Sequence, residues 1–197
     1  RRSAGSAQVR TDTSDDATPV APKTAGTMPA RHIDPAAPWL AAIGANPNSK
    51  KFSAALAARV RLTFDDASAG VSHHEEWEAV FHPLTNPFDP SAGVAVDHDP
   101  RDFRDEAPAG ATYVLPEAPV DSKAWFKEVE STLRDHLAAR RTVTVFRNRV
   151  LKLFSRVGEE EAAFLVRCRT AADAAADADL VEVKGKLQTR LDRARDA

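Results

Sequence analysis

Two stretches of the chain alternate between apolar and polar residues in the way that half-buried strands do. In residues 56–66 (LAARVRLTFDD), the apolar side chains of Val60, Leu62 and Phe64 fall on one side and polar side chains on the other. A period of two residues is typical of a strand with one face toward a core. Residues 65–70 (DDASAG) have the composition of a turn, so this strand is expected to end there.

A second strand is predicted after this turn, within residues 75–84 (EEWEAVFHPL). Trp77, Ala79 and Phe81 alternate with two glutamates and a valine, and we expect this strand to pair with the first. The spacing from Trp77 to Phe81 also fits a turn of helix, which is the competing interpretation. Pro83 ends the element in either case.

Apolar residues spaced by three and four predict a helix that begins after a cap at Asp121 or Ser122 and ends near Ala139. The residues with this spacing are Trp125, Phe126, Val129, Leu133 and Leu137. The preceding residues 85–119 are rich in Pro, Asp and Gly. They contain one short apolar segment, 111–116, where a single strand is expected.

After this helix comes a β-rich run, 141–148 (RTVTVFRN), and then, after a short interruption, residues 150–155 (VLKLFS). From Gly158 onward the pattern is helical, with three glutamates in the predicted first turn, where the helix dipole favours negative charge. A narrow apolar stripe then follows on a charged helix, formed by Leu180, Val183, Leu187, Leu191 and Ala194. Such a stripe is typical of a coiled-coil seam.

Together these elements predict an α+β fold. It comprises a small, mainly antiparallel sheet packed by one amphipathic helix, followed by a long C-terminal helix with coiled-coil character. Residues 1–30 are expected to be a disordered linker, because so polar a stretch cannot bury enough apolar area to offset its ordering entropy. Residues 31–157 would form the α+β domain and residues 158–197 the long helix.

The net charge of −2, from 27 Lys and Arg against 29 Asp and Glu, does not indicate a polyanionic partner. The charges are nevertheless uneven, since residues 65–106 carry eleven carboxylates and two arginines. The single Cys168 excludes an intramolecular disulfide and suits a reducing compartment. No apolar run approaches the roughly 20 residues of a membrane helix, so we expect a cytoplasmic protein with no membrane partner.

Catalytic motifs are absent from the sequence. Its glycines do not form GxxxxGK[ST], and GxSxG, HExxH and CxxC do not occur, so the chain is expected to be non-catalytic, without a cofactor or metal of its own. Imidazoles and carboxylates gather in residues 72–78 (SHHEEWE). His73 and His74 would face opposite ways in an extended chain, which argues against one metal site. Cys168 shares a helical face with Phe164 and Ala171, so its side chain is expected to pack against apolar neighbours.

Residues 134–156 form a basic band, with seven Lys and Arg against one Asp. Four of these cations lie close to Phe146 and Phe154 in the sequence: Arg147, Arg149, Lys152 and Arg156. Cations with interleaved rings suit nucleic acid, because they neutralise phosphates while the rings stack on bases. The alternative, which we favour, is ion pairing with the acidic residues 65–106 of the same fold.

Three blocks of the sequence, residues 34–47, 56–84 and 125–168, together resemble the C-terminal region of bacterial ATP-binding proteins of the HerA/FtsK-like group. The order of the last block, a helix ending in DHL, then TVTVFRN, LKLFSRVGEEEAAF and a long helix, carries most of the resemblance. It implies that ATP and Mg²⁺ bind in an upstream P-loop domain, of the helicase HerA central-domain kind, and that this chain is a part of such a protein.

We therefore expect a non-catalytic interaction or regulatory region of a larger HerA-like ATPase, in some cases a DNA translocase. Its partners would be its own upstream ATPase domain and a second copy or another protein. The residues expected to mediate this contact are Leu180, Val183, Leu187 and Leu191. A DNA-binding module using the 134–156 band is the first alternative. A free-standing small hydrolase centred on His73, His74 and Glu76 is the second.

Overall fold

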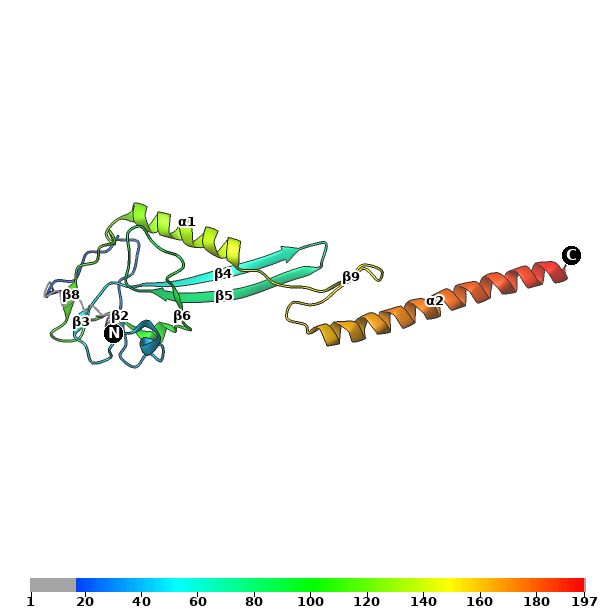
Figure 1. Ribbon diagram of the computed structural model, residues 1–197, viewed down its shortest axis with the longest axis horizontal. Coiled ribbons are helices and arrows are strands. Elements are labelled where there is room, and N and C mark those ends of the chain that lie inside the picture. The colour runs from blue at the N-terminus through cyan, green and yellow to red at the C-terminus, as the bar shows by residue number, and fades with distance from the viewer. Residues whose placement is uncertain (1–16, 197) are drawn as a thin grey trace, which may run out of the picture. The chain divides into compact units, whose positions relative to one another are not determined.

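The computed structural model of this chain describes residues 17–196 (Figure 1). The described chain divides into two compact units. Unit 1 comprises residues 17–60 and 76–140, and unit 2 comprises Arg61–Glu75 and residues 141–196. The predicted boundary between residues 157 and 158 differs from this division, because part of the long central hairpin groups with the C-terminal segment.

The hairpin predicted from the alternating pattern is present. Strand β4 (Leu56–Asp66) and strand β5 (Val71–Phe81) are neighbours in a three-stranded sheet, and β5 also pairs antiparallel with β6 (Val94–Ala95). Exposed and partly buried residues alternate along most of β4, as the spacing predicted. The helical alternative for Trp77–Phe81 is wrong, since this segment completes β5.

Short strands tie distant parts of unit 1 together. Strand β8 (Thr112–Val114), at the predicted position, lies between β1 (Ala17–Thr18), antiparallel, and β3 (Lys51–Phe52), parallel. Strand β2 (His32–Ile33) pairs antiparallel with β7 (Phe103–Arg104). The α+β class is therefore confirmed, although the β structure consists of several small sheets.

The linker predicted for residues 1–30 is wrong for its second part. Residues 17 and 18 form β1, and the buried Ala25 donates its backbone N–H to the carbonyl oxygen of Val120 at 2.9 Å. These contacts attach a polar segment to the rest of unit 1 by backbone hydrogen bonds. The spacing of apolar residues in the sequence gives no sign of such bonds. The rest of the predicted linker, residues 1–16, lies outside the described residues.

Two 3₁₀ helices complete the loops of unit 1. The first, η1 (Leu40–Ile43), ends at Gly44, whose φ of 69° is the left-handed conformation that favours glycine. The second, η2 (Pro100–Asp102), precedes β7. One buried core cluster lies around η1 and the adjoining strands, and its members are Ala37, Trp39, Leu40, Val80 and Val96.

The predicted amphipathic helix is α1 (Lys123–Arg140), drawn in green to yellow in Figure 1. It buries four of the five residues in the predicted pattern, each four positions after the last: Trp125, Val129, Leu133 and Leu137. Phe88 links this helix to β5, since its ring lies 4.9 Å from Phe81 and 6.5 Å from Trp125. Phe126, predicted on the same face, is only partly buried.

Ser122 caps α1, because its Oγ accepts a hydrogen bond from the backbone N–H of Trp125 at 3.3 Å. Ser122→Ala is expected to lower the free energy of unfolding by about 1 kcal/mol, since the amide loses its partner. Ser131→Ala is the control, because Ser131 is an exposed position within the helix, where alanine favours the helix slightly. Urea unfolding followed by tryptophan fluorescence measures both, and equal midpoints would contradict the cap.

In unit 2, the β-rich run 141–148 forms a strand only at its end. Strand β9 (Arg147–Asn148) pairs antiparallel with β10 (Leu153–Phe154), whereas residues 141–146 have no regular structure. The Oδ1 atom of Asn148 accepts the N–H groups of Val150 and Leu151 at 3.1 and 3.0 Å. This side chain therefore turns the backbone directly after β9, which strand propensity does not register.

The long C-terminal helix is α2 (Glu161–Arg195), and it begins later than predicted. Gly158 has a φ of 74°, Glu160 is the N-cap residue, and only Glu161 of the three glutamates lies in the first turn. The carboxylate of Glu159 instead accepts the backbone N–H of Arg156 at 2.7 Å and a guanidinium N–H of Arg167 at 2.5 Å. Of the three glutamates, Glu159 therefore stabilises the turn between β10 and α2, and Glu161 lies in the first turn of the helix.

Candidate functional site

The α2 stripe, defined as Leu180, Val183, Leu187 and Leu191, lies on the surface of the described chain. The exposed fractions of these residues are 55, 52, 53 and 54 %. Every residue in 172–196 is exposed, so this part of α2 packs against nothing else in the described chain. Four large apolar side chains along one face of an unpacked helix are suited to contact another protein.

The stripe is separate from the face that α2 uses for its own packing. Phe164 and Cys168, near the start of the helix, are buried, and the ring of Phe146 stacks on Phe164 with centroids 6.1 Å apart. The predicted packing of Cys168 is therefore confirmed. With 3.6 residues per turn, the packed face and the stripe point about 120° apart around the helix. Intrachain packing leaves the stripe open.

The basic residues proposed for nucleic acid lie on and after the β9–β10 hairpin. All four are exposed: Arg147, Arg149, Lys152 and Arg156. The guanidinium carbon of Arg147 lies 5.1 Å from the ring centroid of Phe154, which is a cation–π contact. The ring of Phe146 stacks on Phe164, and the ring of Phe154 contacts the guanidinium group of Arg147. Both rings therefore already have partners inside unit 2.

Two ion pairs of the acidic residues 65–106 involve arginines outside the basic band. Glu78 pairs with Arg59, and Asp105 pairs with Arg31. Within the band, Arg134 pairs with Glu130 one helical turn away on α1. These contacts are local or lie inside unit 1. Pairing of the basic band with the acidic residues 65–106 stays a prediction.

His73 and His74 point to opposite faces of β5, as expected. The ring of His73 lies 6.1 Å from that of Phe64, whereas Nδ1 of His74 lies 3.1 Å from Oγ1 of Thr63. A hollow of about 390 Å³ lies beside His73 in unit 2, with Arg156 and Arg167 in its lining. Among residues 17–196, no group of three or more His, Cys, Asp and Glu is arranged to hold a metal ion.

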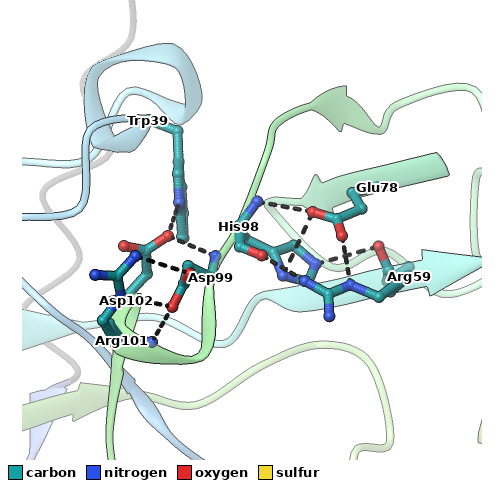
Figure 2. A network of polar contacts seen from close by, with 8 residues as sticks. Trp39, Arg59, Glu78, His98, Asp99, Arg101 and Asp102 are labelled. Atoms are coloured by element: carbon teal, nitrogen blue, oxygen red, sulfur yellow. Dashed lines mark hydrogen bonds and ion pairs between the residues drawn. The ribbon is translucent and has the colours of Figure 1, made fainter. Parts of the chain in front are cut away.

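The polar network that sequence reasoning missed lies in unit 1, between the hairpin and residues 98–102 (Figure 2). The Glu78 carboxylate accepts a guanidinium N–H of Arg59 and the backbone N–H of His98, the latter at 2.8 Å. Arg59 also donates to the carbonyl oxygen of His98 at 2.6 Å. Burial alone would raise the pKa of Glu78, but the hydrogen bonds from His98 and Arg59 lower it overall.

The neighbouring part of the network stabilises η2. Asp99 and Asp102 form a reciprocal capping box, and the Asp102 carboxylate also accepts the indole N–H of Trp39 at 2.7 Å (Figure 2). Hydrogen bonds from Arg101 lower the pKa of Asp99 to about 2. The segment DPRD, residues 99–102, could have indicated η2 and its cap in the sequence. An acidic cap followed by a proline and a second acid is typical of a helix start.

No protein-family model, curated protein or solved structure matches this sequence. In the described part of the chain, neither helix combines the length and the apolar character that crossing a bilayer requires.

Proposed function

We propose that this chain is a non-catalytic interaction region that associates through α2. The observation that carries the proposal is the exposure of the α2 stripe on a helix whose residues 172–196 have no other packing partner in the described chain. A helix of this kind gains stability when a second helix covers its apolar face. Oligomerisation or docking of a partner helix is the direct use of such a surface.

In this proposal, catalysis belongs to another part of the protein. The resemblance implies an upstream HerA-like domain that binds ATP and Mg²⁺, and the present region would bring copies or partners of that domain together in the cytoplasm. The hydrolase alternative has less support, because His73 and His74 face apart and each contacts the neighbouring strand. Nucleic-acid binding also has less support, since base stacking needs ring faces that Phe146 and Phe154 already use.

Leu187→Asp is expected to raise the dissociation constant for association of the chain at least about a hundredfold, because it would bury an unpaired carboxylate in an apolar contact. Sedimentation velocity over a range of protein concentrations measures this effect. The matched control is Val181→Asp, which introduces the same charge on α2 at a 71 % exposed valine away from the stripe. Identical sedimentation of wild type and Leu187→Asp would refute the role of the stripe.

A further inference from the structure

Charges are segregated along the exposed part of α2. Its first half, residues 172–183, carries four carboxylates and no Lys or Arg: Asp173, Asp177, Asp179 and Glu182. Its second half, residues 184–195, carries five cations and the single carboxylate of Asp192: Lys184, Lys186, Arg190, Arg193 and Arg195. The sign of the charge thus changes next to Val183, in the middle of the α2 stripe.

The helix dipole accounts for only part of this order. Its effects act within the first and last turns of a helix, so it favours Arg193 and Arg195 in the last turn of α2. It does not reach the four carboxylates, which begin about three turns after Glu161, or Lys184 and Lys186. Nor does the fold of the chain use these charges, because all of residues 172–196 are exposed. The ion pair from Lys186 to Glu182 and the hydrogen bond from Gln188 to Asp192 both lie within α2.

The apolar positions are also arranged around Val183. With small residues included, the stripe extends in both directions to Ala172, Ala176 and Ala194. Ala172 and Ala194 each lie eleven residues from Val183, a spacing that keeps apolar positions on one side of a nearly straight helix. Both the apolar spacing and the change of charge therefore have the same midpoint.

We propose that the occupant of the α2 stripe is α2 of a second copy, antiparallel to the first, with the two-fold axis beside Val183. This inference rests on the proposed function and adds the identity and direction of the partner. An antiparallel pair places the acidic half of each helix beside the basic half of the other, whereas a parallel pair places like charges together.

The midpoint beside Val183 sets which residues of the two helices lie opposite each other. Leu180 then packs beside the partner's Leu187, and Ala176 beside the partner's Leu191, so that a small residue faces a large one. In an antiparallel pair, residues on the same flank of both stripes face each other, because the two-fold axis is perpendicular to the helices. Asp179 accordingly meets the partner's Arg190, and Asp173 meets the partner's Arg195. Flanking charges of this kind set orientation in helix pairs.

Cysteine cross-linking of the full chain distinguishes the two orientations. In a Cys168→Ala background, one preparation carries Ala176→Cys and another carries Leu191→Cys. After mild oxidation, the mixture is expected to give at least about tenfold more covalent dimer than either variant alone, because only the mixed pair brings two cysteines within disulfide range. Each variant alone would leave its cysteines about 22 Å apart along the antiparallel pair.

The outcomes separate this inference from the proposed function. Cross-linking of Ala176→Cys with itself would mean a parallel pair, which overturns the antiparallel arrangement and leaves self-association standing. A wild-type chain that sediments as a monomer at all concentrations overturns both.

Where a cysteine variant no longer dimerises, exchanging the charges at positions 179 and 190 tests the same antiparallel pairing. Asp179→Lys should weaken the dimer about tenfold and the additional Arg190→Glu should restore it, while a further weakening would refute the pairing.

Discussion

Phe81→Ala is expected to lower the free energy of unfolding of unit 1 by about 3–5 kcal/mol, the usual cost of truncating a buried phenylalanine. Phe81 is only 1 % exposed, and its ring lies 4.9 Å from Phe88 and 6.4 Å from Trp77. Gly93 packs so closely that a Cβ atom there would lie 2.7 Å from Phe81 Cε1. Because the ring joins β5, the segment around Gly93 and, through Phe88, α1, its loss leaves a cavity shared by three elements.

The measurement is urea unfolding followed by tryptophan fluorescence, which reports on unit 1 because all three tryptophans, Trp39, Trp77 and Trp125, belong to it. The matched control is Leu115→Ala, which truncates a large apolar residue of the same unit that is 65 % exposed. It should change the free energy of unfolding by less than about 0.5 kcal/mol. A loss of under about 1 kcal/mol for Phe81→Ala would contradict the central position of this ring.

Glu78→Gln is expected to cost about 1.5–3 kcal/mol at neutral pH, because hydrogen bonds to a charged group are lost and Arg59 is left without its carboxylate. The side chain of Glu78 is only 11 % exposed, whereas that of Arg59 is 44 % exposed and partly screened by solvent. The control is Glu128→Gln, the same change at an exposed position on α1, which should have little effect.

The cost of Glu78→Gln should also depend on pH. The folded protein lowers the pKa of Glu78 below its ordinary value of 4.5, so the folded state keeps this carboxylate ionised where the unfolded chain takes up a proton. Its contribution to stability is therefore present above about pH 4.5 and disappears as pH falls through the lowered pKa. Unfolding curves of wild type and variant should converge on acidification, and a constant difference down to pH 3 would contradict the argument.

The longer elements of this fold could be predicted because each carries its own repeating pattern. Strand β4 alternates along most of its eleven residues, β5 alternates along its first part, and α1 repeats a buried residue every four positions from Trp125 to Leu137. Strands of two residues carry no such repeat. Strand β1 exists because Ala17 pairs with Val114, and nothing in the local sequence around Ala17 specifies a partner so far along the chain.

The α2 stripe and the basic band differ in the same way: one follows from a local pattern, and the other depends on tertiary contacts. The α2 stripe could be predicted because helical geometry alone places Leu180 and Leu187 on one face of α2. The environment of the basic band could not, because it depends on how a turn at Asn148 brings Arg147 over Phe154. The Glu78 network was missed for a similar reason, since its hydrogen bonds join residues 19 or more positions apart.

The length of α2 sets how far apart two associated copies would hold the structures attached to them. With a rise of about 1.5 Å per residue and an axis beside Val183, Glu161 and the partner's Glu161 would lie roughly 65–70 Å apart, at opposite ends of the helix pair. The two β9–β10 hairpins, which precede α2, would then enter the helix pair from its opposite ends. Such a pair would therefore separate its two copies by the length of the helices at the point where each chain enters α2, rather than bring those points side by side.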